Sequence, residues 1–156
     1  EALDRETAFL AQYPEQTMAL ILLRVLDYTE SGVVAHASQA LQHWYEDLRR
    51  VIRAGTIPGR IHEFELGFVL RKCDVEGAQK ALTRYLQAIQ ASRPASGDGA
   101  IGFLAPALGA VIASGKFHPT AQSILQFAQN ELFRSGFDPA RLPVLEYVPK
   151  TAAKKR

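Results

Sequence analysis

The histidines are the residues best suited to hold a metal ion, and their spacing argues against it. His36 and His43 lie seven residues apart in a segment with helical periodicity. At about 1.5 Å of rise per residue they are separated by roughly 11 Å, too far for two imidazoles to share one ion. His62-Glu63 lacks the second histidine of a zinc-protease motif. We therefore predict no metal site and assign no catalytic residue.

A glycine-rich stretch has the spacing of a phosphate-binding loop. Gly97, Gly99 and Gly102 match G-x-G-x-x-G, whose glycines let the backbone approach a pyrophosphate at a helix N-terminus. That motif requires a preceding strand, and here a predicted helix and a Pro-Ala-Ser turn precede it. We therefore predict no cofactor, and whether this loop holds an anion stays open.

The single cysteine, Cys73, excludes an intrachain disulfide and a cysteine-cluster metal site within one chain. This usage is typical of a reducing compartment, so we predict a cytoplasmic protein. Arg71 and Lys72 precede the cysteine and would favour its thiolate, but no histidine lies beside it in the sequence. An ordinary thiol near a helix end is the interpretation that we adopt.

Arg49, Arg50, Arg53 and Arg60 form the densest basic cluster in the interior of the sequence, and we expect Arg71 and Lys72 to lie near it. Arg49, Arg50 and Arg53 lie where a predicted helix ends. A charged rim beside an apolar helix face can steer an acidic partner. Basic side chains in a last turn also stabilise the helix dipole, so an ordinary helix end is the alternative. We predict that these arginines bind a protein partner.

The stretch 103–134 has features of a helix-turn-helix. Its second helix would present polar side chains able to read base edges, beside one cation. These residues are Lys116, Gln122, Ser123, Gln126 and Asn130. The connection Ser114–Pro119 is longer than the usual turn, and a formal net charge of +2 is too small to indicate a polyanionic partner. Nucleic-acid binding is therefore the alternative function.

The most apolar segment, Met18–Leu26, is predicted to be the core of a central helix over Pro14–Ser31. Pro14 suits a first helical turn, and apolar side chains cover nearly the whole circumference, as in a buried helix. Arg24 is the one charge in this segment. We expect it to pair with Asp27, three residues on.

The remaining elements are predicted from apolar residues that recur every three or four positions. They are helices over Leu3–Tyr13, Val33–Ala54, Arg60–Lys72, Val75–Ile89, Phe103–Ala113 and Thr120–Arg134, with Asp74 as an N-cap. Only Val144–Val148 alternates like a strand, and it has no evident partner. The predicted fold is all-α, a single-domain orthogonal or antiparallel bundle of about seven helices with an extended Pro-rich C-terminal segment.

The length of 156 residues suits one domain, which we place at 1–149. Its subparts 1–92 and 100–135 are joined by a Gly/Ser/Pro loop, and 150–156 is a basic tail that we expect to be disordered. No apolar run is long enough to span a bilayer, so we predict no membrane insertion.

These features favour a helical protein–protein interaction module, part of a larger bacterial-type protein or assembly. The seam of apolar residues between Val34 and Val51 faces either another helix of the chain or a second copy, so a homodimer is an alternative. The nucleic-acid-binding regulatory domain is the second hypothesis. An enzyme is the third, because no complete catalytic constellation is present.

Overall fold

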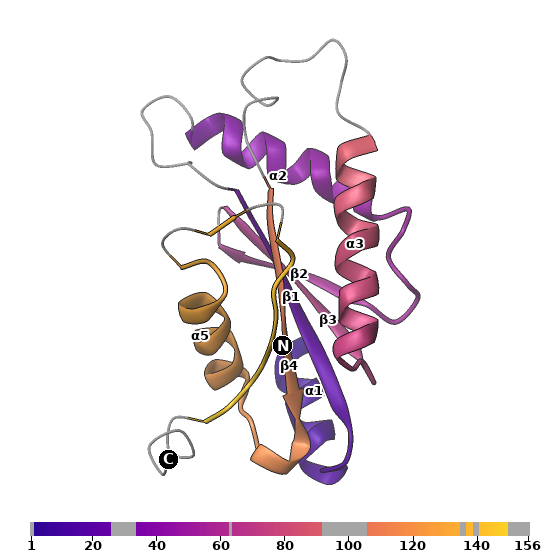
Figure 1. Ribbon diagram of the computed structural model, residues 1–156, viewed down its shortest axis with the longest axis vertical. Coiled ribbons are helices and arrows are strands. Elements are labelled where there is room, and N and C mark those ends of the chain that lie inside the picture. The colour runs from indigo at the N-terminus through magenta and orange to yellow at the C-terminus, as the bar shows by residue number, and fades with distance from the viewer. Residues whose placement is uncertain are drawn as a thin grey trace.

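The computed structural model describes residues 2–25, 34–62, 64–91, 106–134, 137–138 and 141–149. They form three layers, with a five-stranded mixed sheet between two pairs of helices (Figure 1). Helices α2 (Val34–Leu48) and α3 (Val75–Ala91) pack on one face, and α1 (Ala2–Gln12) and α5 (Ala121–Glu131) on the other. The strands are β1 (Thr17–Val25), β2 (Ile57–His62), β3 (Glu65–Arg71), β4 (Pro106–Ser114) and β5 (Val144–Glu146), and the short 3₁₀ helix η1 (Gly115–Phe117) follows β4.

The most apolar segment of the chain is the strand β1, so the central helix predicted over Pro14–Ser31 is wrong. Its side chains alternate between the two faces of the sheet. Ile21 and Leu23 pack in the cluster under α2 and α3, whereas Leu20 and Leu22 pack in the cluster under α1 and α5. A strand buried on both faces is an almost unbroken apolar run, and a buried helix has the same composition.

The strand order is β2-β3-β1-β4-β5. All pairs are antiparallel except β4 with β5, which is parallel. The all-α bundle of about seven helices is therefore wrong. Two more of its helices are strands, because Arg60–Lys72 covers most of the β2–β3 hairpin and Phe103–Ala113 overlaps β4. Val144–Val148 also has a partner, since its first three residues pair with β4.

The helices predicted at Leu3–Tyr13, Val33–Ala54, Val75–Ile89 and Thr120–Arg134 are confirmed as α1, α2, α3 and α5, although α2 already ends at Leu48. The predicted N-cap is confirmed too, because the Asp74 carboxylate accepts a hydrogen bond of 2.8 Å from the Gly77 N–H. These segments were identified correctly because each buries only one face, which leaves a clear helical period.

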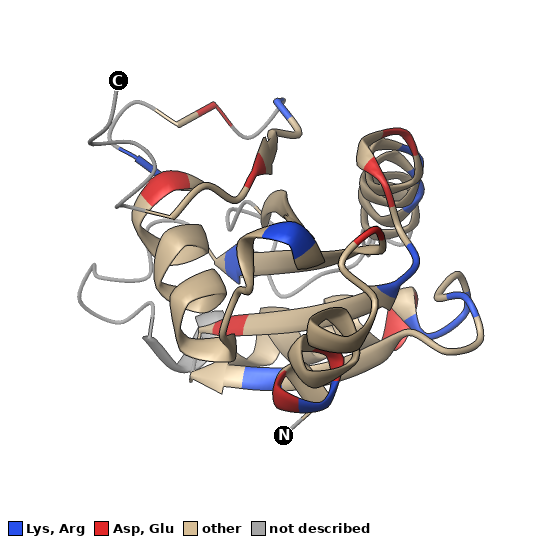
Figure 2. Cartoon of the chain, turned by 90° about the horizontal axis from the view of Figure 1, so that it is seen from below, with Lys and Arg blue, Asp and Glu red and all other residues tan. Residues whose placement is uncertain are grey.

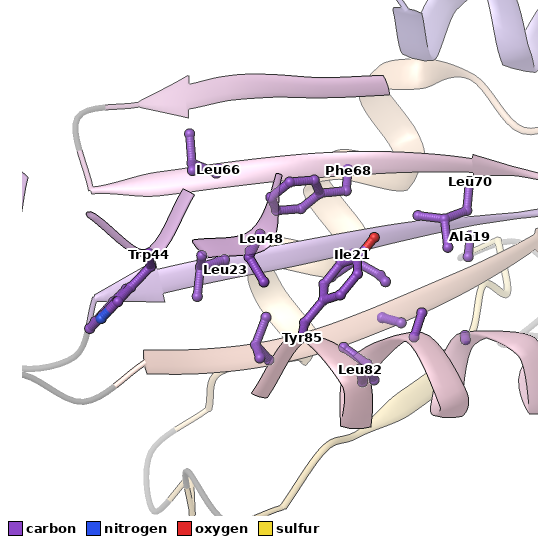
Figure 3. Packing of buried hydrophobic residues seen from close by; sticks show 14 of the residues in the cluster. Ala19, Ile21, Leu23, Trp44, Leu48, Leu66, Phe68, Leu70, Leu82 and Tyr85 are labelled. Atoms are coloured by element: carbon purple, nitrogen blue, oxygen red, sulfur yellow. The ribbon is translucent and has the colours of Figure 1, made fainter. Parts of the chain in front are cut away.

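The larger core cluster lies between the sheet and the helices α2 and α3 (Figure 3). Phe68 of β3 meets Tyr85 of α3 edge to face, with ring centroids 5.5 Å apart. Leu41, Trp44 and Leu48, the seam of α2, are buried in the same cluster. The seam is therefore accounted for by packing within one chain.

None of the helices in the described ranges is long and apolar enough to cross a membrane. The glycine-rich loop 97–102 and the basic tail 150–156 lie outside the described residues.

Candidate functional site

A cavity of about 730 Å³ opens at the end of the sheet where β3 finishes. Three segments that are distant in sequence build its walls: the turn before β1, the loop between α2 and β2, and the connection from β3 to α3. Its charged and hydroxyl- or thiol-bearing residues are Glu15, Thr17, Arg53, Thr56, Arg71, Lys72, Cys73 and Asp74. We call it the Arg53 cavity.

Backbone contacts between β1 and the end of β3 hold one wall of the Arg53 cavity in place. The Thr17 hydroxyl donates to the Cys73 carbonyl at 2.9 Å, and the Cys73 N–H donates to the Thr17 carbonyl at 3.2 Å. Lys72 adopts a left-handed conformation, with φ of 48°, which turns the chain from β3 towards α3. Lys72 therefore lies at the rim of the Arg53 cavity, in a segment whose backbone is held by these contacts.

Positive charge dominates the part of the Arg53 cavity that is free to meet a ligand. Arg53 and Lys72 are both exposed and come from different walls. Figure 2 shows the basic segments of the loop after α2 and of the end of β3 on the same side of the molecule. Arg71 bonds to Glu6 of α1, with 2.7 Å between Nε and Oε2, yet its side chain remains 58% exposed. Arg53 and Lys72 thus line one opening from different walls, while the Arg71 guanidinium is paired with Glu6.

The two acidic residues of the Arg53 cavity offset this charge only in part. The Asp74 carboxylate is already engaged by the Gly77 N–H as the cap of α3. Glu15 is exposed in the turn before β1, where water screens its charge. Guanidinium and ammonium groups arranged in this way suit an anion, above all a phosphate.

The thiol in the cavity wall is not prepared for nucleophilic attack. Cys73 is buried, and burial raises its pKa above the ordinary 9.0. The charge of Asp74 raises this pKa further, and Arg53 lowers it to a smaller extent. Because the thiolate is the reactive form, a raised pKa disfavours nucleophilic attack by this thiol.

Two other cavities have less cationic linings. One of about 360 Å³ between α2 and β2 contains a single arginine, Arg60, together with Glu46. Another of about 510 Å³ lies beside α5 and contains Glu131 and no basic residue. Of these three cavities in the described part of the chain, the Arg53 cavity suits an anionic ligand best.

The structure separates the three arginines predicted to bind a partner. Arg53 lines the cavity, whereas Arg49 and Arg50 are exposed just beyond α2. Arg49 forms an ion pair with Glu46 at 3.2 Å, one turn earlier on the same helix. The role of these residues as a partner-binding set stays a prediction.

The residues predicted to read nucleic acid lie on η1 and α5, but a strand precedes α5, so the helix-turn-helix is wrong. Ser123 forms a reciprocal capping box with Thr120 at the start of α5. Lys116 lies over the ring of Phe117 at 5.1 Å in η1, and Gln122 is exposed on α5. Gln126 and Asn130 line the cavity beside α5 together with Ser123.

Sequence reasoning placed Lys72 near the arginine cluster but named neither Lys72 nor Thr56 as a site residue. A basic pair directly before the N-cap Asp74 is a signal for the β3–α3 wall. No sequence feature indicates that this pair lies across a cavity from Arg53.

No family model and no curated protein match the sequence, but solved structures are similar to it. The GGDEF domain of DgcB from Caulobacter crescentus, in complex with c-di-GMP, has a TM-score of 0.69 and 16% identity, over 93% of this chain and 85% of that one. Vibrio cholerae LapD, an S helix-GGDEF-EAL structure bound to c-di-GMP, gives 0.63 and 12%, over 99% of this chain and 37% of the longer one. The active GGEEF domain of a Vibrio cholerae diguanylate cyclase gives 0.55 and 14%, over 96% of each.

These similarities overturn the function predicted from the sequence. A helical interaction module and a DNA-binding regulatory domain both presuppose an all-α chain, and the neighbours are α/β domains. At identities of 12–16% the likeness establishes architecture and not activity. The chain has the fold of GGDEF domains.

Proposed function

We propose that this chain is a c-di-GMP-binding domain that acts as a receptor and not as a cyclase. The observation that carries the proposal is the Arg53 cavity, where Arg53 and Lys72 face one opening from different walls. Two of the similar structures, those of DgcB and LapD, contain c-di-GMP. A cyclic dinucleotide therefore gives the cavity a ligand whose chemistry can be compared with its lining.

The chemistry of c-di-GMP matches that lining. Each ligand has two phosphodiester charges, and arginine and lysine are the usual partners of phosphate oxygens. Its guanine bases present O6 and N7 together, the acceptor pair that a guanidinium binds with two hydrogen bonds. The volume of about 730 Å³ is within the range of small-molecule sites.

Receptor activity is favoured over synthesis by the sequence of the β2–β3 hairpin region. The chain has no two adjacent glycines, so neither Gly-Gly-Asp-Glu-Phe nor Gly-Gly-Glu-Glu-Phe occurs in it. Its one Glu-Phe pair is Glu63-Phe64, preceded by Ile61 and His62. A second argument is that the carboxylate of Glu65, at the start of β3, already forms an ion pair with the Arg24 guanidinium and is therefore not free.

Isothermal titration of the purified protein with c-di-GMP tests the proposal. We expect saturable binding that weakens as salt rises, because the contacts are ionic. Arg53→Glu and Lys72→Glu should each weaken binding by at least about tenfold, the equivalent of about 1.4 kcal/mol. Arg50→Glu is the matched control, since it makes the same charge change on an exposed arginine that does not line the Arg53 cavity.

Two results would contradict the proposal. Absence of saturable binding, or equal binding by the Arg53→Glu, Lys72→Glu and control proteins, would remove the Arg53 cavity as a c-di-GMP site. Incubation with GTP and Mg²⁺ followed by chromatography tests whether the chain synthesises c-di-GMP. Formation of c-di-GMP would show that the chain is a cyclase.

A further inference from the structure

Two adjacent side chains of α3 lie beside the loop that carries Arg53. The Arg84 Nε donates a hydrogen bond of 3.0 Å to the Val51 carbonyl, two residues before Arg53. The next residue, Tyr85, points from α3 into the core cluster and is fully buried (Figure 3). Neither side chain lines the Arg53 cavity. The helix α3 therefore reaches the loop without being part of the cavity wall.

The loop has further contacts after Arg53. The Thr56 N–H donates to the Arg53 carbonyl at 3.1 Å and closes a turn in which Gly55 has a φ of 92°. Burial raises the pKa of Tyr85 above its ordinary 10.0, and the neighbouring Arg84 guanidinium and Thr56 side chain lower it to a smaller extent. The strand β2 begins directly after Thr56. Arg53 thus lies between a contact with α3 on one side and the start of a paired strand on the other.

The contact with Val51 is the distinctive feature of Arg84. Within the described residues, the Val51 carbonyl is the one hydrogen-bond partner of the Arg84 guanidinium, whose Nη2 is buried without a partner. A hydrogen bond from a charged donor is stronger than one between neutral groups. This bond also restricts the loop before a ligand binds, whereas a loop that is ordered only during binding lowers the affinity. Arg84 therefore favours the loop conformation that places Arg53 at the cavity.

We infer that Arg84 is a positioning residue for the Arg53 cavity. Its bond to the Val51 carbonyl holds the loop so that Arg53 and Lys72 line one opening before an anionic ligand arrives. Arg84 acts through Arg53 and does not touch the ligand. The inference rests on the proposed function for its ligand, c-di-GMP, whereas the fixing of the loop is a property of the free protein and can be measured without a ligand.

Isothermal titration with c-di-GMP tests the role of Arg84 in binding. Arg84→Met keeps a long side chain but loses the donor, and it should weaken binding by about two- to tenfold, because the loop must then be ordered during binding. Arg84→Lys retains a charged donor and should recover most of the affinity. Lys80→Met is the matched control, because Lys80 lies one turn earlier on α3, is 72% exposed and pairs with Glu76. The control should bind c-di-GMP as the wild type does.

A double-mutant cycle separates positioning from direct contact with the ligand. If Arg84 acts through Arg53, Arg84→Met should lower the affinity no further in an Arg53→Ala background and should have its full effect in a Lys72→Ala background. An equal loss in both backgrounds would overturn the inference, because Arg84 would then act independently of Arg53. Wild-type affinity in Arg84→Met would overturn it as well.

Hydrogen exchange of the free proteins tests the fixing of the loop without a ligand. The Thr56 amide and the other amides of 51–56 should exchange faster in Arg84→Met than in the wild type, Arg84→Lys or Lys80→Met. Equal exchange in all four proteins would overturn the inference, whether or not c-di-GMP binds. Faster exchange in Arg84→Met together with no binding by the wild type would instead contradict the proposed function and support Arg84 as the residue that fixes the loop.

Discussion

Replacing Arg24 by alanine should destabilise the fold more than any exposed charge change. The substitution leaves the Glu65 carboxylate fully buried with Gln129 as its remaining close donor. Breaking a buried ion pair from one side typically costs about 3–5 kcal/mol. We expect the lower end, about 3 kcal/mol, because the Arg24 side chain is 20% exposed and water can enter the space it leaves.

Urea unfolding followed by Trp44 fluorescence measures this free energy. In a chain of this size the loss corresponds to a fall in melting temperature of about 6–12 °C. The double variant Arg24→Ala/Glu65→Leu should recover much of the stability, because it removes the unpaired charge as well. Arg49→Ala is the control, since it breaks an ion pair whose partners are 60% and 57% exposed, and we expect a change within about 0.5 kcal/mol. A loss below about 1 kcal/mol for Arg24→Ala would refute the reasoning.

Three further predictions follow from burial. Leu22→Ala should cost about 2–5 kcal/mol in urea unfolding, as a truncation of a fully buried side chain in the central strand, and a loss below about 0.5 kcal/mol would contradict this placement. Trp44 is 5% exposed, so its fluorescence should be blue-shifted and independent of protein concentration; a shift that appears only on concentration would indicate burial between two copies. Burial raises the pKa of Cys73 above 9.0, so the folded state holds this proton longer and the free energy of unfolding should fall as pH rises past 9.0. Cys73→Ala should reduce that slope, and an unchanged slope would exclude the thiol as its source.

The sequence predicts the four helices well and the sheet poorly, for one physical reason. Each helix buries a single stripe, so its apolar residues recur with the helical period. β1 is buried on both faces and has no period to detect. The length of the apolar run was the signal that could have identified the strand. Met18–Leu26 is short for a buried helix that spans the whole core, and its length suits a strand.

The hairpin was misread because aromatic residues obscured its alternation. Phe64 and Phe68 are four residues apart, as on one face of a helix. The register instead follows Leu66, Phe68 and Leu70, which all belong to the cluster under α2 and α3. The two-residue period of Leu66, Phe68 and Leu70 is present in the sequence. Gly67 stands between the first two where a polar residue would normally mark the solvent side of a strand, so the alternation is hard to recognise.

Long-range pairing explains why the site residues were found only in part. Arg53 was identified by its charge, but its distance from Lys72 depends on how β2, which follows the Arg53 loop, pairs with β3, where Ile57 lies opposite Val69. The prediction that Arg24 pairs with a nearby carboxylate assumed a helix, in which Asp27 would be a neighbour. In a strand the neighbour is the register partner, Glu65, which is distant in sequence.

The antiparallel pairing of β1 with β3 connects the buried Arg24–Glu65 ion pair with the Arg53 cavity. At one end it sets Arg24 against Glu65, and at the other it joins Thr17 to Cys73 beside the Arg53 cavity. Charge is therefore arranged differently at the two ends of one strand pair. At the first end a buried carboxylate is neutralised within the chain, so no external cation is required. At the second end Arg71 is paired with Glu6, whereas Arg53 and Lys72 are exposed at the cavity, where we propose that an anionic ligand binds.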